Sequence, residues 1–225
     1  MKRNVLFVSV HPDDETLGCG GTILKHKALG DTINWLNVTD IDNNHPLGFS
    51  TDLIRETQVS IDKVKDSYGF IKCINLKFYT MLLDTVGLSS LIKKISEAIN
   101  EIQPDTLYIP NRSDVHSDHK ITFQAIYSCT KQFRYPFIKR VLMYETLSET
   151  EFAPALAENA FIPNVFVDIS DYLEDKLKIM ELYDTEIMPD PLPRSKYAIR
   201  ALAAYRGSRI CVQYAEAFQS LMEIL

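Results

Sequence analysis

The feature that most constrains the fold is a short apolar segment near the start of the chain, residues 5–10 (VLFVSV), which ends directly in charged residues. Such a valine-rich run is typical of a strand buried on both faces of a parallel sheet. Open α/β sheets bind ligands outside the carboxyl ends of their strands, so the residues after this run lie where such a fold places its chemistry. They are His11-Pro12-Asp13-Asp14-Glu15, and the proline stiffens the turn.

The remaining segments alternate between strand and helix patterns, which is typical of an α/β fold. We expect further strands at residues 32–38, 70–76, 106–110, 140–144 and 164–167. The first expected helix begins near residues 17–21 and ends at Gly30. Further helices are expected over 51–68, 89–103, about 116–126 and 171–183, with two short helices after a proline-rich loop at 189–193. The pattern predicts a single α/β domain over residues 1–225, Rossmann-like, with a mostly parallel sheet, helices on both faces and an active site at the carboxyl ends of the strands.

The overall charge and the cysteines exclude several classes of protein. A net charge of −6 without a Lys/Arg-rich run argues against nucleic acid as a partner, because phosphate binding requires a basic face. The four cysteines have no C-x-x-C pair, so they indicate neither a disulfide framework nor a structural zinc ribbon. No segment matches a signal peptide or approaches the ~20 apolar residues of a membrane span. We therefore expect a cytoplasmic protein without a membrane anchor.

Histidines and acids gather at two predicted strand ends. The first group is the one around His11, and the second lies in residues 111–119 (NRSDVHSDH), just after the apolar segment 106–110. Imidazole and carboxylate are the ligands of a catalytic zinc, which takes three protein ligands and leaves a position for water. A single loop His-Asp pair is usually only solvated surface. Two such groups after two buried strands, holding three of the five histidines of the chain, favour a metal site instead.

The glycines of Gly18-Cys19-Gly20-Gly21 also suggest a dinucleotide site, but the G-x-G-x-x-G pattern is not matched. The acids at the end of the strand would repel a pyrophosphate, so we do not expect a nucleotide cofactor.

The two motifs together carry a resemblance to a known family. His11-Pro12-Asp13-Asp14-Glu15, followed later by His116-Ser117-Asp118-His119, resembles the PIG-L/LmbE family of zinc-dependent N-acetylglucosamine deacetylases. Ser117 stands where that family usually has proline, and Asp184-Thr185-Glu186 where many members have a Ser-Gln pair. Further matches spread the resemblance over nearly the whole chain: Thr16 to Gly21, Arg55-Glu56, Val167 to Ser170 and Tyr214 to Phe218.

The resemblance implies a role for each motif residue. One Zn²⁺, or another divalent metal, is held by the implied ligands His11, Asp14 and His119, and it makes hydroxide available near neutral pH. Asp13 is the general base, and a protonated His116, held by the carboxylate of Asp118, stabilises the oxyanion. Arg55 contacts the substrate. Either Asp13 or His116 returns a proton to the leaving amine.

The implied reaction removes the N-acetyl group from an N-acetylglucosamine-type sugar conjugate and releases acetate. The group attached to the sugar stays open, although an acidic chain without an anchor favours a soluble precursor, such as a sugar conjugate or a nucleotide sugar. Alternatives are a metal-dependent phosphoesterase, another amidohydrolase, or a non-catalytic α/β binding module. Metallophosphatases usually hold two ions and need more ligands than these motifs supply. A homo-oligomer is compatible with the sequence.

Overall fold

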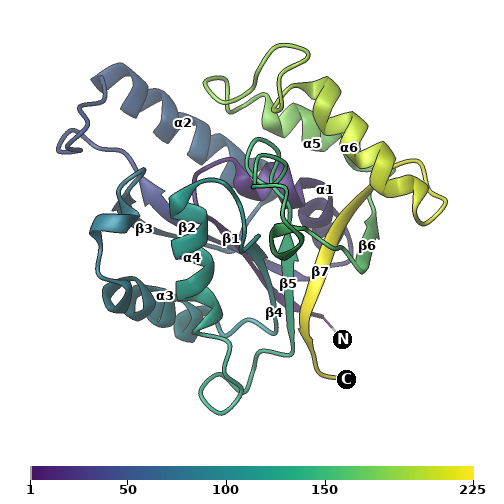
Figure 1. The fold of residues 1–225 in the computed structure, drawn as a ribbon, viewed down its shortest axis with the longest axis horizontal. Coiled ribbons are helices and arrows are strands. Elements are labelled where there is room, and N and C mark those ends of the chain that lie inside the picture. Colours follow the sequence, from purple (N-terminus) through teal and green to yellow (C-terminus); the bar gives the residue numbers. More distant parts are fainter. Residues whose placement is uncertain (1) are drawn as a thin grey trace.

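The computed structural model describes residues 2–225 and contains one mixed sheet between two layers of helices (Figure 1). The seven strands lie in the order β3-β2-β1-β4-β5-β7-β6, and only β7 runs antiparallel to its neighbours. Their bounds are β1 (Asn4–Ser9), β2 (Thr32–Asp40), β3 (Lys72–Tyr79), β4 (Thr106–Pro110), β5 (Arg140–Tyr144), β6 (Val165–Asp168) and β7 (Ala215–Glu223). The predicted α/β fold with a mostly parallel sheet is confirmed.

The helices cover both faces of the sheet. They are α1 (Asp14–Ala28), α2 (Thr51–Tyr68), α3 (Leu88–Ile102), α4 (Ser117–Tyr127), α5 (Leu173–Met180) and α6 (Lys196–Ser208), with short 3₁₀ turns η1 (Leu83–Thr85) and η2 (Ala157–Asn159). Successive side chains of a strand point to opposite faces. Accordingly, Val5 and Phe7 of β1 join the core beneath α1, α2, α5 and α6, whereas Leu6 and Val8 join the core beneath α3 and α4. This burial on both faces explains the apolar run at the start of the chain.

The strand order reverses direction beside β1. The chain moves from β1 outward to β2 and β3, and then returns to place β4 on the other side of β1. The loops after β1 and β4 therefore diverge from a shared crevice, which is the topological switch point where such sheets bind ligands. Both charged motifs of the sequence follow these two strands.

The C-terminal region differs from the prediction of two short helices. One helix is present, α6, but the segment after it is strand β7, which pairs with both β5 and β6. Its sequence, AEAFQSLME, is rich in helix-forming residues, so local propensity favours a helix. The open hydrogen-bonding edge of β5 and the burial of Phe218 outweigh that preference. Among the described residues, no helix has the length and apolar character needed to cross a membrane.

Candidate metal centre and catalytic cavity

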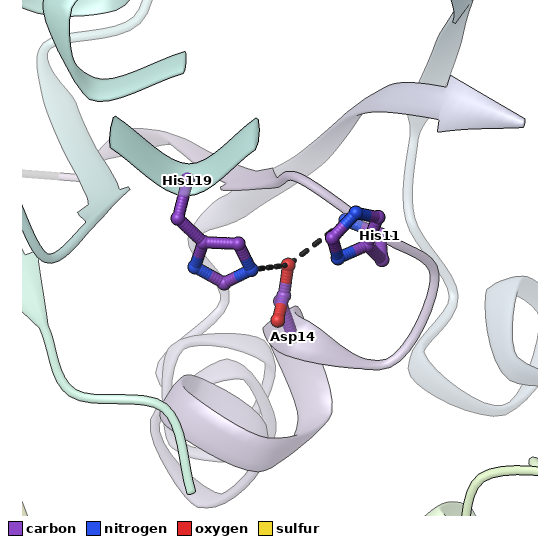
Figure 2. A group of neighbouring side chains, drawn as sticks. All are labelled: His11, Asp14 and His119. Carbon is purple, nitrogen blue, oxygen red and sulfur yellow. Dashed lines mark hydrogen bonds and ion pairs between the residues drawn. The ribbon is translucent and has the colours of Figure 1, made fainter. Parts of the chain in front are cut away.

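Three side chains from the two motifs meet at the switch point (Figure 2). His11 follows β1, Asp14 is the first residue of α1, and His119 lies in the first turn of α4. One potential ligand atom from each lies within 4.8 Å of those of the other two. The structure thus brings together the three residues that the sequence pattern singled out, and this group can bind a metal ion.

A sharp turn of the backbone sets the position of Asp14. The preceding residue, Asp13, adopts φ 146°, a value that L-residues rarely take. The turn folds the Asp14 carboxylate back onto the end of β1, where Oδ2 accepts hydrogen bonds from the backbone N–H groups of Val10 and His11, each at 2.9 Å. The same oxygen lies 3.4 Å from His119 Nε2. Strained conformations of this kind persist where the surroundings fix them, and they are frequent at active sites.

The buried ring of His119 is arranged to offer one nitrogen to a cation. Its Nδ1 donates to Asp114 Oδ2 at 2.8 Å, which leaves Nε2 facing Asp14. Within residues 2–225, this Nε2 has no hydrogen-bond partner. Burial disfavours a charge here, but the carboxylates of Asp14 and Asp114 outweigh it and raise the pKa of His119 to about 9. In the metal-free protein a proton therefore occupies Nε2 at neutral pH, and a metal ion bound there would take the place of that proton. A carboxylate-histidine pair is the usual support of a metal-binding imidazole.

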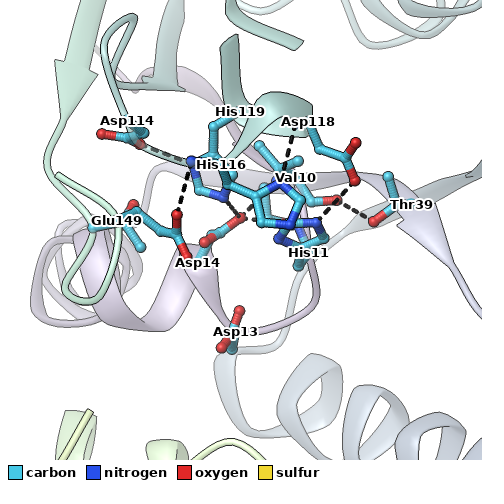
Figure 3. Close-up of polar contacts among 12 residues, drawn as sticks. Val10, His11, Asp13, Asp14, Thr39, Asp114, His116, Asp118, His119 and Glu149 are labelled. Atoms are coloured by element: carbon cyan, nitrogen blue, oxygen red, sulfur yellow. Dashed lines mark hydrogen bonds and ion pairs between the residues drawn. The ribbon is translucent and has the colours of Figure 1, made fainter. Parts of the chain in front are cut away.

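Asp118 lies in a different place from the one expected. Its carboxylate accepts hydrogen bonds from the backbone N–H groups of Met81 and Leu83. It also lies 3.2 Å from Nε2 of His11 (Figure 3). It does not hold the ring of His116. Because Nε2 of His11 faces this carboxylate, Nδ1 remains for a metal.

His116 is positioned by backbone contacts instead. It caps α4, where its Nδ1 accepts the N–H of Asp118 at 3.1 Å, and its own N–H donates to Glu149 Oε2 at 3.2 Å. Burial, and then the neighbouring His11, lower the pKa of His116. The lowered pKa favours the neutral ring in the metal-free protein, and a neutral ring that accepts at Nδ1 carries its proton on Nε2.

A cavity of about 320 Å³ opens beside this group. Its lining includes His11, Asp13, Asp14 and His116. The Asp13 side chain caps no helix N–H, and its Oδ2 lies 3.4 Å from Nη1 of Arg194. Burial, Asp14 and Glu186 raise the pKa of Asp13 well above its usual range, while Arg194 opposes the shift.

The predicted substrate residue Arg55 lies outside this cavity. Its exposed guanidinium pairs with Asp52 at 3.1 Å within the first turns of α2. The arginine that does line the cavity is Arg194, from the end of the proline-rich loop. Neither Arg194 nor its partner Glu186 was among the predicted site residues. No local pattern marks either residue, because their place follows from the packing of a distant loop.

Comparison with known proteins places the chain in a family. A family model described as "GlcNAc-PI de-N-acetylase" (PIG-L) matches residues 6–130, a segment that contains both motifs. The chain belongs to the PIG-L family. It is accordingly an enzyme, a deacetylase that hydrolyses amide bonds.

Two related proteins align with most of this PIG-L chain. Diacetylchitobiose deacetylase of Thermococcus kodakarensis is 22% identical over 95% of this chain and 81% of its own length. The Bacillus cereus protein named "Probable N-acetyl-alpha-D-glucosaminyl L-malate deacetylase 2" is 27% identical over 79% of this chain and 80% of its own length.

The fold is shared with solved structures. The conserved protein TT1542 from Thermus thermophilus superposes with a TM-score of 0.77 and 23% identity, over 99% of this chain and 96% of that one.

Proposed function

We propose that this PIG-L member is a zinc-dependent hydrolase that removes the N-acetyl group from an N-acetylglucosamine-type sugar conjugate, releasing acetate and a free amine. The observation that carries the proposal is the unpartnered, buried Nε2 of His119, which faces the Asp14 carboxylate beside the cavity. His11, Asp14 and His119 are the proposed ligands. The names of the two relatives, which specify a diacetylated sugar and a glucosaminyl malate, support an N-acetylated sugar as substrate.

Each remaining motif residue takes one part of the reaction. A bound zinc ion supplies Lewis acidity and a water of lowered pKa. Asp13, which lines the cavity next to Asp14, takes the proton from the attacking water. His116 donates a hydrogen bond from Nε2 to the oxygen that becomes negative as the carbonyl is attacked. Asp118 acts on His11 and not on His116, because it fixes the ring of a metal ligand through Nε2. Asp13 and His116 both line the cavity and can return a proton to the leaving amine.

The test offers the zinc-loaded protein a panel of N-acetylglucosamine conjugates together with phosphoester and peptide substrates. We expect amine and acetate in equal amounts and about one metal ion per chain. Release of phosphate without amine would support the phosphoesterase instead. A protein that binds no metal after metal-replete purification would contradict the proposed ligand set.

A further inference from the structure

The catalytic cavity contains an arginine that belongs to neither motif. Among the described residues, Arg194 is the one Lys or Arg side chain that lines this cavity. It lies in the segment that joins α5 to α6, outside the residues 6–130 that the family model matches. Its side chain is only 21% exposed, so most of it is packed against the protein. Family membership therefore implies no role for Arg194.

One nitrogen of Arg194 makes both of its charged contacts. Nη1 donates a hydrogen bond to Oδ2 of Asp13 at 3.4 Å and forms an ion pair with Oε2 of Glu186 at 3.0 Å. The buried Nε has no hydrogen-bond partner within residues 2–225. The guanidinium is thus only partly engaged. Two roles are compatible with these contacts: Arg194 holds the Asp13 carboxylate, or it binds the substrate through its remaining donors.

The Asp13 carboxylate has few other restraints. The side chain caps no helix N–H, and within the described part of the chain Arg194 is the one residue that donates a hydrogen bond to this carboxylate. Because Arg194 occupies Oδ2, Oδ1 is left to accept a proton. A general base must lie within hydrogen-bond reach of the proton that it takes. A displacement of about 1 Å at such a group can cost on the order of 10²-fold in rate.

The backbone of Arg194 is fixed by the start of α6. The next residue, Ser195, is the fully buried N-cap of this helix, and its Oγ accepts the N–H of Ala198 at 3.1 Å. The carbonyl of Arg194 accepts the N–H of Met188 at 3.3 Å, which closes the loop between these two residues. Glu186 adds a counter-charge to the guanidinium. The contact with Asp13 is therefore formed before any substrate binds.

We propose, resting on the deacetylase function above, that Arg194 is a positioning residue for the general base Asp13, and that Glu186 holds Arg194 in place. The hydrogen bond from Nη1 restrains the Asp13 side chain and leaves Oδ1 to take the proton of the attacking water. An arginine suits this role because its guanidinium is planar and stays charged. The C-terminal loop thereby contributes to a reaction whose proposed ligands and base all lie within residues 11–119.

The experiment measures kcat, KM and metal content of zinc-loaded Arg194→Met, with the N-acetylglucosamine conjugate that the wild type hydrolyses fastest. We expect kcat to fall about tenfold or more, KM to change by less than about twofold, and the metal content to stay at the wild-type level. Arg194→Lys should recover part of kcat, because an ammonium group can still donate to Asp13. A raised KM at unchanged kcat overturns the proposal, since it indicates a contact with the substrate. Loss of metal in Arg194→Met overturns it as well.

A double-mutant cycle tests whether Arg194 acts through Asp13. In the Asp13→Asn background, Arg194→Met should change the residual kcat by less than about twofold, because the base that Arg194 positions is already absent. A loss as large as the one in the wild-type background would show that Arg194 acts on the substrate directly, and it would overturn the proposal.

Two further variants test the role of Glu186 and the specificity of the effect. Glu186→Gln should lower kcat by a smaller factor than Arg194→Met, and it should cause no further loss in the Arg194→Met background. An unchanged kcat in Glu186→Gln contradicts the part of Glu186. The matched control is Arg200→Met, which removes an arginine of α6 that pairs with Glu174 outside the cavity lining and should leave kcat unchanged. Wild-type kcat in Arg194→Met overturns this inference alone, whereas no amine from any conjugate with the wild type overturns the deacetylase function itself.

Discussion

The carboxylate of Asp114 determines which nitrogen of His119 faces the cavity. Its Oδ2 accepts a hydrogen bond from Nδ1–H of His119, while Oδ1 accepts hydrogen bonds from Asn111 and Thr150, so the carboxylate itself is held in place. None of these three hydrogen bonds could be predicted from the sequence, although Asp114 lies only five residues before His119. The metal site therefore depends on a residue that is not one of its ligands.

We predict that Asp114→Asn weakens metal affinity by about 10- to 100-fold, the usual cost of losing the partner of a ligand histidine. The amide no longer fixes the Nδ1 proton, so Nε2 is not held as an acceptor. Competition with a chromogenic chelator measures the affinity, with Asp66→Asn on the exposed side of α2 as the control. Unchanged affinity in Asp114→Asn would show that His119 is oriented by other contacts.

We predict that Asp13→Asn keeps its metal and loses about 10²- to 10⁴-fold in kcat, because the amide has nearly the same shape but cannot accept the proton. The measurement pairs turnover of an N-acetylated glycoside with the metal content of the same sample. Turnover near that of the wild type in a fully loaded variant would place the base elsewhere.

The sequence predicted the motif residues but not all of their contacts. His11, Asp14 and His119 come together because buried strands end just before both motifs and those strands are neighbours in the sheet. The partner of Asp118 and the exposed position of Arg55 were not foreseen. Both depend on side-chain directions that the motif spacing does not encode.

At the scale of elements, helix α1 is held by a buried ion pair from other parts of the chain. Glu216 of β7 accepts the backbone N–H groups of Gly21 and Thr22, and Lys176 of α5 donates both to Glu216 at 2.7 Å and to the carbonyl of Leu17 at 2.8 Å. Glu216 and Lys176 therefore form hydrogen bonds to backbone groups in the middle of α1, the helix that begins at Asp14.

The glycines of α1 allow this close packing. A Cβ atom at Gly18 would lie 2.3 Å from the ring of Tyr144, and one at Gly21 would lie 2.7 Å from Ile169. The glycine-rich segment that suggested a dinucleotide site therefore has a packing role. It lets the helix that carries Asp14 lie directly against its neighbours.

We predict that Glu216→Gln lowers the free energy of unfolding by about 3–5 kcal/mol, because it leaves the Lys176 ammonium buried without a counter-charge. Urea denaturation measures the loss. The double variant Lys176→Met/Glu216→Gln should recover part of it, since no unpaired charge remains. Lys178→Met, which removes an exposed lysine of the same helix, is the control. A loss as small as that of the control would contradict the importance of the pair.

For the whole molecule, the sequence predicted the class of fold and the order of most elements, because buried strands and amphipathic helices have clear periodicities. It did not predict β7, whose residues favour a helix in isolation and become a strand only because β5 and β6 offer hydrogen-bonding edges. Long-range pairing of this kind is not contained in a local pattern. The place of the site was predictable because both motifs directly follow predicted buried strands, and open α/β sheets bind ligands at the carboxyl ends of their strands.

Several buried groups make the stability of the whole molecule depend on pH, and they act in opposite directions. Burial raises the pKa of Glu15 to about 7, above its unfolded value of 4.5, so its contribution is present at low pH and is lost as pH rises. Burial lowers the pKa of His26 below its unfolded value of 6.5, against the pull of Asp31, so its contribution is present above that value and is lost as pH falls. The neutral ring fits its surroundings, since it can donate from Nδ1 to Asp31 and accept from the Tyr108 hydroxyl at Nε2.

We predict that the stability difference between the wild type and His26→Asn shrinks as pH falls from about 7.5 to 5.5, across the window below the unfolded histidine pKa. In this pH range His26 is protonated in the unfolded wild type more readily than in the folded protein, whereas asparagine does not titrate. Urea unfolding with a chelator present removes the pH dependence of metal binding, and taking the difference between the two proteins cancels the opposite trend of Glu15. His45→Asn, at another buried histidine, is the matched control. A difference that grows on acidification would show that folded His26 is a cation paired with Asp31, because such a ring would stabilise the protein more at low pH.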